Sequence, residues 1–153
     1  MTVLLLALLI GVVAGLRTFT APAAVSWAAY LGRLPLDNTA LAFLGSVWAV
    51  AILTGMVLVE TVVDQLPSTA SRTVPVQFAG RIVTAAVAGA AIAAPPGLLI
   101  AGGIAGIVGA VIGTLGGHAA RLKLAAALRN DAPAGFIEDA VAIAGALLIV
   151  MVL

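Results

Sequence analysis

The 153-residue sequence has no cysteine, one histidine and few charged residues. The absence of cysteine excludes disulfide bonds, thiolate metal ligands and cysteine nucleophiles. Only 8% of the residues are charged, against roughly a quarter in soluble proteins. The seven basic residues form no run that could neutralise a row of phosphates, so we expect no nucleic-acid partner.

Residue patterns that carry metal or catalytic chemistry are also sparse. His118 has no histidine or acidic residue at a ligand spacing, so an interfacial hydrogen bond is a better explanation of it than a metal site. There is no GxSxG motif, and no serine has a neighbouring base in the sequence. We therefore expect no enzymatic activity, no metal and no cofactor.

Apolar residues, by contrast, make up 63% of the chain, and the mean hydropathy is +1.27. This composition predicts an integral membrane protein whose main partner is the lipid bilayer. The length allows about five spans of roughly 20 residues and no soluble domain. We predict one all-α domain over residues 1–153, a polytopic bundle of transmembrane helices.

The first apolar run, 2–16, is interpreted as a retained first span. It is interrupted by GLRTFTAP, where glycine and proline disfavour a continuous helix. A broken helix, or a span followed by a re-entrant or interfacial piece, fits this pattern. Further spans are expected at 41–66, 75–94, 97–117 and from 131 to 153. Asp131 is the expected N-cap of the last span.

Basic residues in the loops predict the orientation. One side carries Arg72, Arg121, Lys123 and Arg129, and the other only Arg33. The positive-inside rule then places the turn at 67–74 and the segment 118–132 in the cytoplasm. Five spans put the N-terminus inside and the C-terminus outside, whereas a sixth crossing near 18–31 would reverse the N-terminus.

A faint repeat relates the segment that starts at Gly11 to the segment that starts at Gly109. In the five-span topology these segments cross in opposite directions, which is the pattern of an inverted repeat.

Glycines spaced by four form small faces on the fourth span, at Gly102, Gly106, Gly109, Gly113 and Gly117. Such faces let another backbone approach closely. Close packing within the subunit is the first interpretation, the seam of a homodimer the second and a glycine-lined pore the third. We expect the protein to be a homodimer.

Two acidic residues near the end of the second span are the main candidate site. Glu60 lies six residues before Leu66, and Arg81 lies six residues after Pro75, so antiparallel spans place both about 9 Å inside the helix ends. We predict that Glu60 pairs with Arg81, and Asp64 with Arg72. These pairs could lock a hairpin, or the carboxylates could bind cations or protons.

Glu138 and Asp139 fall early in the last span, where acidic side chains interact favourably with the helix dipole. Their position towards the same membrane face as most other charges also predicts a polar cytoplasmic vestibule.

Arg17 lies inside the broken first segment. Such an arginine either faces the interior as an anion or headgroup site, or extends to the outer interface.

Taken together, GLRTFTAP, ETVVDQLP, the SRT that follows and EDAVAIAG resemble the bacterial family of small integral membrane proteins called domain of unknown function 4126. The resemblance covers essentially the whole chain but implies no activity. It implies that the family's characteristic polar positions are Arg17, Glu60, Asp64, Pro67, Arg72, Glu138 and Asp139. Gln65 departs from the lysine usual in the family, which argues against a role needing a third charge in that turn.

These observations favour a channel or transporter for a small solute or ion, with Glu60 and Asp64 as cation or proton sites. The alternatives are a structural or assembly protein whose charges lock the bundle, and a lipid-headgroup enzyme. A transporter should have a cavity that reaches Glu60 or Arg17, whereas sealed ion pairs without such a cavity favour the structural role.

Overall fold

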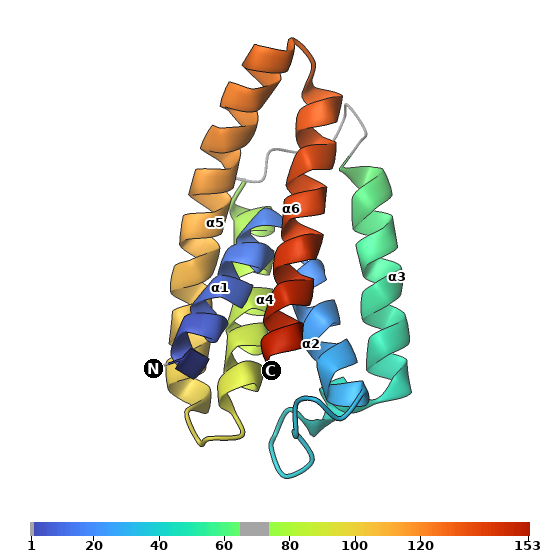
Figure 1. Ribbon diagram of the computed structural model, residues 1–153, viewed down its shortest axis with the longest axis vertical. Helices are drawn as coiled ribbons and strands as arrows, with labels where there is room; N and C mark the ends of the chain where they lie inside the picture. Colours follow the sequence, from blue (N-terminus) through green and yellow to red (C-terminus); the bar gives the residue numbers. More distant parts are fainter. Residues whose placement is uncertain (1, 65–73) are drawn as a thin grey trace.

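The computed structural model describes residues 2–64 and 74–153 (Figure 1). These residues form α-helices, one short 3-10 helix and no strand, which confirms the all-α prediction. The elements are α1 (Thr2–Leu16), α2 (Thr20–Tyr30), η1 (Ala42–Gly45), α3 (Val47–Val63), α4 (Pro75–Ala93), α5 (Leu99–Leu128) and α6 (Asp131–Val152).

Three of the helices, α4, α5 and α6, are long and apolar enough to cross a membrane, and α1 and α3 are shorter apolar helices. Large apolar side chains also cover the outer surface, among them Trp48, Ile100 and Met151. Such an apolar exterior suits lipid rather than water. The protein is a multi-pass membrane protein.

Local capping explains where two helices differ from the predicted spans. The predicted span 41–66 is divided into η1 and α3, because Ser46 adopts an extended conformation and its Oγ accepts a hydrogen bond from the Ala49 N–H at 3.1 Å. Asn130, not Asp131, is the N-cap of α6, since its Oδ1 accepts from the Ala132 N–H at 3.1 Å. α5 does not end near Gly117 but continues without interruption to Leu128.

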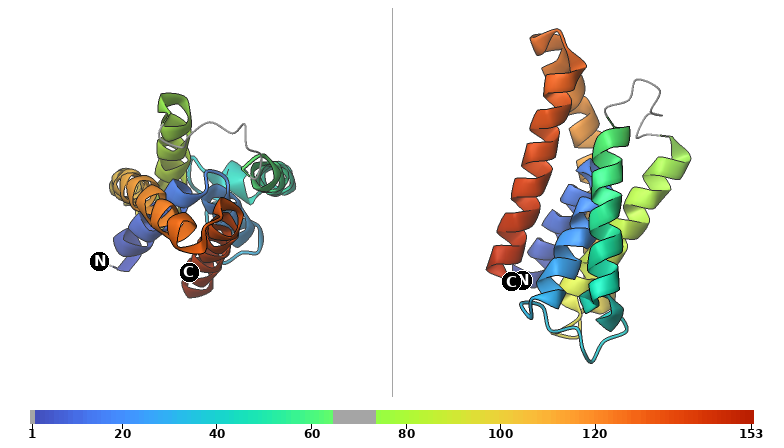
Figure 2. Two further views of the ribbon diagram at one scale, coloured as in Figure 1. Left: turned by 90° about the horizontal axis from the view of Figure 1, so that it is seen from above. Right: turned by 90° about the vertical axis from the view of Figure 1, so that its right-hand side faces the viewer.

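The first segment reverses direction at residues 17–19. α1 runs parallel to α5, because Gly11 contacts Gly106 and Gly15 contacts Ala110 further along the same helix. α2 runs parallel to α6, and therefore opposite to α1, because Arg17 contacts Asp139 and Arg33 contacts Val150. Figure 1 and the right-hand view of Figure 2 show α1 and α2 side by side on this reversed path.

This reversal changes the predicted topology. The described residues contain six α-helices of alternating direction instead of five spans, and the N- and C-termini lie at the same end of the bundle (Figure 2). The prediction that the termini face opposite sides is therefore wrong, and the alternative with a sixth segment near 18–31 matches the structure. The inverted repeat is not confirmed, because the segment that starts at Gly11 reverses direction after α1, whereas the segment that starts at Gly109 continues along α5 without a break.

Glycines place α5 directly against the backbones of two neighbouring helices. Gly109 and Gly113 face the backbone of α1 at Val12, whereas Gly102 and Gly106 face α4 at Gly89 and Ala85, respectively. A Cβ atom at any of these four glycines would collide with the neighbouring backbone or side chains. The interpretation of close packing within the subunit is confirmed for these four residues, while Gly117 is half-buried near the end of the series.

Candidate functional site

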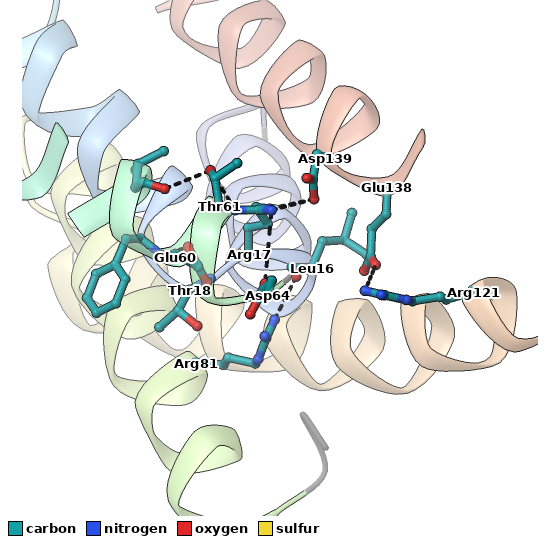
Figure 3. A network of polar contacts seen from close by, with 12 residues as sticks. Leu16, Arg17, Thr18, Glu60, Thr61, Asp64, Arg81, Arg121, Glu138 and Asp139 are labelled. Carbon is teal, nitrogen blue, oxygen red and sulfur yellow. Dashed lines mark hydrogen bonds and ion pairs between the residues drawn. The ribbon is translucent and has the colours of Figure 1, made fainter. Parts of the chain in front are cut away.

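The break between α1 and α2 leaves backbone polar groups exposed inside the bundle. A helix cannot bond its own last carbonyls or its first N–H groups, and lipid offers no replacement partners. Charged side chains from α3, α4 and α6 converge on this point (Figure 3).

Glu60 binds the start of α2. Its Oε1 accepts a hydrogen bond from the Thr18 N–H at 2.7 Å, and its Oε2 accepts from the Phe19 N–H at 3.1 Å. The side chain is buried, so the carboxylate lies in a medium of low dielectric next to the positive end of the α2 dipole. Both oxygens of Glu60 are thus engaged by the backbone.

Arg81 binds the end of α1 in the complementary way. Its Nη1 donates to the carbonyl oxygens of Gly15 and Leu16, both at 2.7 Å, and the Thr114 hydroxyl also donates to Gly15 at 3.2 Å. The predicted ion pair between Glu60 and Arg81 is wrong. The two side chains do lie at the same depth, but each is directed to one end of the break, where the helix dipoles attract opposite charges.

Arg17 lies at the centre of the cluster and is only 2% exposed. Its Nε donates to Asp139 Oδ1 at 2.7 Å, its Nη1 donates to the Thr61 hydroxyl at 3.1 Å, and its Nη2 lies 2.6 Å from Asp139 Oδ1 and 4.0 Å from Asp64 Oδ2. Arg17 therefore faces the interior and does not extend to an interface. Its guanidinium is shared by two carboxylates of its own chain, which argues against the predicted anion or headgroup site.

Asp64 lies at the end of α3, with its side chain 21% exposed. It is the more exposed of the two carboxylates that flank Arg17, because the Asp139 side chain is 14% exposed. The predicted partner of Asp64, Arg72, lies outside the described residues, as do Gln65 and Pro67, so the structure does not test that pairing.

Glu138 and Asp139 are adjacent on α6 but have different partners. Asp139 binds Arg17, whereas Glu138 lies 3.5 Å from Arg121 Nη1. Arg121 also makes a bidentate contact with Asp131, at 3.0 Å from Nε and 2.6 Å from Nη2. The two acids therefore do more than interact with the α6 dipole. Asp139 joins α6 to the break after α1, and Glu138 joins α6 to α5.

A family model described as "Domain of unknown function (DUF4126)" matches residues 4–153, which is essentially the whole chain. The chain belongs to this family. No curated protein and no solved structure matches it. The predicted family membership of the chain is thus confirmed.

Sequence reasoning missed the hydroxyl and backbone groups of the site, namely Thr61, Thr114 and the N–H groups of Thr18 and Phe19. Thr61 follows Glu60 directly, and its hydroxyl also donates to the Val57 carbonyl at 2.8 Å. A threonine beside a buried acid is a weak sequence signal. The backbone groups give no sequence signal beyond the break itself.

An open, apolar groove of about 210 Å³ lies between α2, α3 and α6. Its walls include Thr20, Ala24 and Trp27 of α2, Val57 of α3 and Ile143 of α6. Neither Arg17 nor Glu60 lines it. Among the described residues, no group of three or more histidine, cysteine or acidic side chains could hold a metal ion.

Proposed function

We propose that this DUF4126 protein passes protons or small cations across the membrane, and that Asp64 and Asp139 are the carboxylates that exchange them. The sequence hypothesis named Glu60 and Asp64 as the cation or proton sites. We retain Asp64 in this role and replace Glu60 with Asp139. Transport is proposed in preference to catalysis, in a homodimer of the bacterial inner membrane whose charged cluster faces the cytoplasm.

The observation that carries this proposal is the sharing of one guanidinium by two carboxylates beside a helix break. Arg17 contacts Asp139 at 2.6 Å and Asp64 at 4.0 Å, so this group of three has one negative charge in excess. Ionisable side chains are costly within a membrane and usually line a path for ions or protons. Broken helices near such charges are a feature of many transporter sites.

An exchange cycle follows from the unequal contacts of the two carboxylates. A cation or proton that reaches Asp64, the more exposed carboxylate, competes with Arg17 for it. Arg17 then keeps its shorter contacts with Asp139 and Thr61. Glu60 and Arg81 hold the two helix ends in place during this exchange because the backbone engages them.

A structural role is the second candidate, and one observation favours it. Glu60 and Arg81 are directed to backbone groups, and the apolar groove reaches neither Glu60 nor Arg17. In that case the charges only hold the broken helix within the bundle.

Flux into proteoliposomes, measured with and without a pH gradient, tests the proposal. We expect Asp64→Asn to reduce proton or cation flux at least about tenfold, since it removes the exchanging charge while Glu60 and Arg81 still hold the break. Asp37→Asn is the matched control, because Asp37 is an exposed acid in the loop at the far end of the bundle.

The outcome separates the two candidates. Equal flux in wild type and Asp64→Asn would refute the carboxylate mechanism. No flux above empty liposomes for folded wild-type protein, with every cation tried, would favour the structural role.

A further inference from the structure

The open groove between α2, α3 and α6 is hollowed because small side chains form its base. Ala23 and Ala146 line it and are buried, whereas Trp27 and Leu147 also line it and are exposed. Small residues are thus its floor and large ones its rims. The groove is part of an apolar exterior that suits lipid rather than water.

The lining offers hydrocarbon contacts and no free polar partner. It contains two hydroxyl groups. The Thr54 hydroxyl accepts a hydrogen bond from Trp27 Nε1 at 3.1 Å, and Thr20 Oγ1 is buried below the surface of the groove. A polar or charged group placed here would lose its water without gaining a partner. The groove therefore suits a hydrocarbon chain.

The size of the groove matches a segment of one such chain. Its volume of about 210 Å³ exceeds the roughly 150 Å³ of a cavity that holds benzene. Along α2 it extends from Thr20 to Trp27, which is roughly 10 Å at 1.5 Å per residue. A longer ligand must continue beyond one end of the groove.

One end of the groove lies among aromatic side chains. Trp27 and Tyr30 are 42% and 49% exposed, and their rings meet edge to face with centroids 6.0 Å apart. Tyr30 ends α2, at the end of the bundle that also carries the two termini (Figures 1 and 2). Tryptophan and tyrosine are enriched where membrane proteins meet lipid headgroups. This end of the groove is therefore the one nearest to the headgroups.

Arg33 supplies a positive charge just beyond this end. Its Nη1 donates to the Val150 carbonyl at 3.2 Å, and Val150 lies three residues, or roughly 4.5 Å, beyond the groove residue Leu147 on α6. Arg33 is exposed, and among the described residues it has this one side-chain hydrogen bond and no ion pair. A guanidinium carries five N–H donors, and arginine binds phosphate strongly. The remaining donors of Arg33 suit a phosphate group.

We propose that the groove between α2, α3 and α6 is a phospholipid site. One acyl chain lies in the groove from Trp27 towards Thr20, and the phosphate binds Arg33 beside the end of α6. This inference goes beyond the proposed transport and does not depend on it, because Asp64 and Asp139 take no part in the site.

Quenching of tryptophan fluorescence by brominated lipid tests the site. The chain has two tryptophans, and Trp48→Phe leaves Trp27 in the groove as the single reporter. In detergent, we expect phosphatidylglycerol with a brominated acyl chain to quench Trp27 saturably, at one lipid per protein. Diacylglycerol with the same chains lacks the phosphate and should bind about tenfold or more weakly. In the Trp27→Phe protein, Trp48, which is 75% exposed, should be quenched equally by both lipids and without saturation.

A substitution of Arg33 in the Trp48→Phe background tests the phosphate contact. Arg33→Gln keeps an N–H donor for the Val150 carbonyl but removes the charge. We expect it to weaken phosphatidylglycerol about tenfold and to leave diacylglycerol unchanged. Lys123→Gln is the matched control, because it removes an exposed positive charge near the other end of the bundle.

A substitution in the wall tests the acyl chain. Ala24→Leu fills the half-buried wall and should weaken both lipids about tenfold, whereas Ala144→Leu, at an exposed position of α6 outside the groove, should weaken neither. Elution as the same species as wild type in size-exclusion chromatography establishes that each variant is folded.

Three outcomes would overturn the phospholipid site. They are equal affinity of the wild-type groove for the two lipids, full phosphatidylglycerol binding in Arg33→Gln, and full binding in Ala24→Leu. A change in Trp27 emission with protein concentration in lipid-free detergent would assign the groove to a second copy of the chain, which also refutes the lipid site. Each of these results leaves the transport proposal standing, since that proposal depends on flux through Asp64.

Discussion

Glu60 shows how one side chain stabilises a broken membrane helix. Its two oxygens accept the N–H groups of Thr18 and Phe19, which would otherwise face a medium without partners. In Glu60→Gln, one oxygen becomes an NH2 group that cannot accept. We expect unfolding in detergent to become about 1–3 kcal/mol easier, because a buried backbone donor loses its partner. Asp37→Asn, in the exposed loop, should leave stability unchanged, and equal stability of both variants would contradict this role of Glu60.

Arg17 and Asp139 should behave as one energetic unit. Their groups lie 2.6 Å apart, and both side chains are mostly buried. Removing either partner leaves a buried charge, which typically costs about 3–5 kcal/mol. We therefore expect the double variant Arg17→Gln/Asp139→Asn to be less destabilised than the sum of the single variants by about 1–3 kcal/mol. Equilibrium unfolding of all four proteins measures this coupling, and strict additivity would contradict it.

The polar positions of the site were predictable from the sequence, whereas most of their partners were not. Acids and arginines in apolar runs are conspicuous, so Arg17, Glu60, Asp64, Arg81 and Asp139 were all identified. Their pairing depends on the chain reversal after Arg17, which brings the end of α1 to the level of Glu60. Antiparallel helix geometry correctly predicted that Glu60 and Arg81 lie at one depth, but it gave no indication that backbone groups lie between them.

At the scale of helices, the α1–α5 contact depends on the absence of side chains. A Cβ atom at Gly109 would collide with the backbone of Leu8 and Val12, which cannot move without shifting α1. We expect Gly109→Ala to destabilise the protein by about 1–3 kcal/mol through overpacking.

Gly116 provides a matched control in the same helix, because open space surrounds its position. Gly116→Ala should be neutral or stabilise α5 by up to about 1 kcal/mol, since alanine loses less backbone entropy. Thermal unfolding of the two variants measures the difference. Equal effects would show that the α1–α5 contact has room for a Cβ atom at position 109.

Helix ranges were predictable where strong local signals exist. The intervals 2–16 and 75–94 match α1 and α4 to within a residue, because an arginine-containing break and prolines mark their ends. The end of α5 was missed because the basic segment after Gly117 is polar, and polarity marks the end of a membrane span rather than the end of a helix. The start of α3 was missed because Ser46 interrupts a continuous apolar run.

In the whole molecule, both termini lie at the same end of the bundle. Site-directed labelling can test this arrangement. The chain contains no cysteine, so Thr2→Cys, Leu153→Cys and Ala127→Cys each introduce a single thiol. We expect a membrane-impermeant maleimide to label the first two from one side of the membrane and Ala127→Cys, next to the end of α5 at Leu128, from the other. Labelling of Thr2→Cys and Leu153→Cys from opposite sides would contradict the six-helix arrangement.

The topology could not be derived from hydropathy because α2 is too short to be recognised as a span. Its 11 residues extend roughly 16 Å, about half of the hydrocarbon thickness of a bilayer. It crosses only part of the bundle, beside α3, α4 and α6. Counting spans by length therefore gives five spans, without α2. An odd number of spans places the N-terminus and the C-terminus on opposite sides of the membrane.

The broken first segment also has a consequence for the order in which the protein assembles. Its polar groups depend on Glu60, Arg81 and Asp139, and the last of these follows Arg17 by 122 residues. A chain that is still being synthesised has made α1 and α2 long before α6 emerges. The residues of α1 and α2 therefore enter the membrane before Asp139 has been synthesised, and a chain truncated before α6 would leave Arg17 without this partner in the lipid.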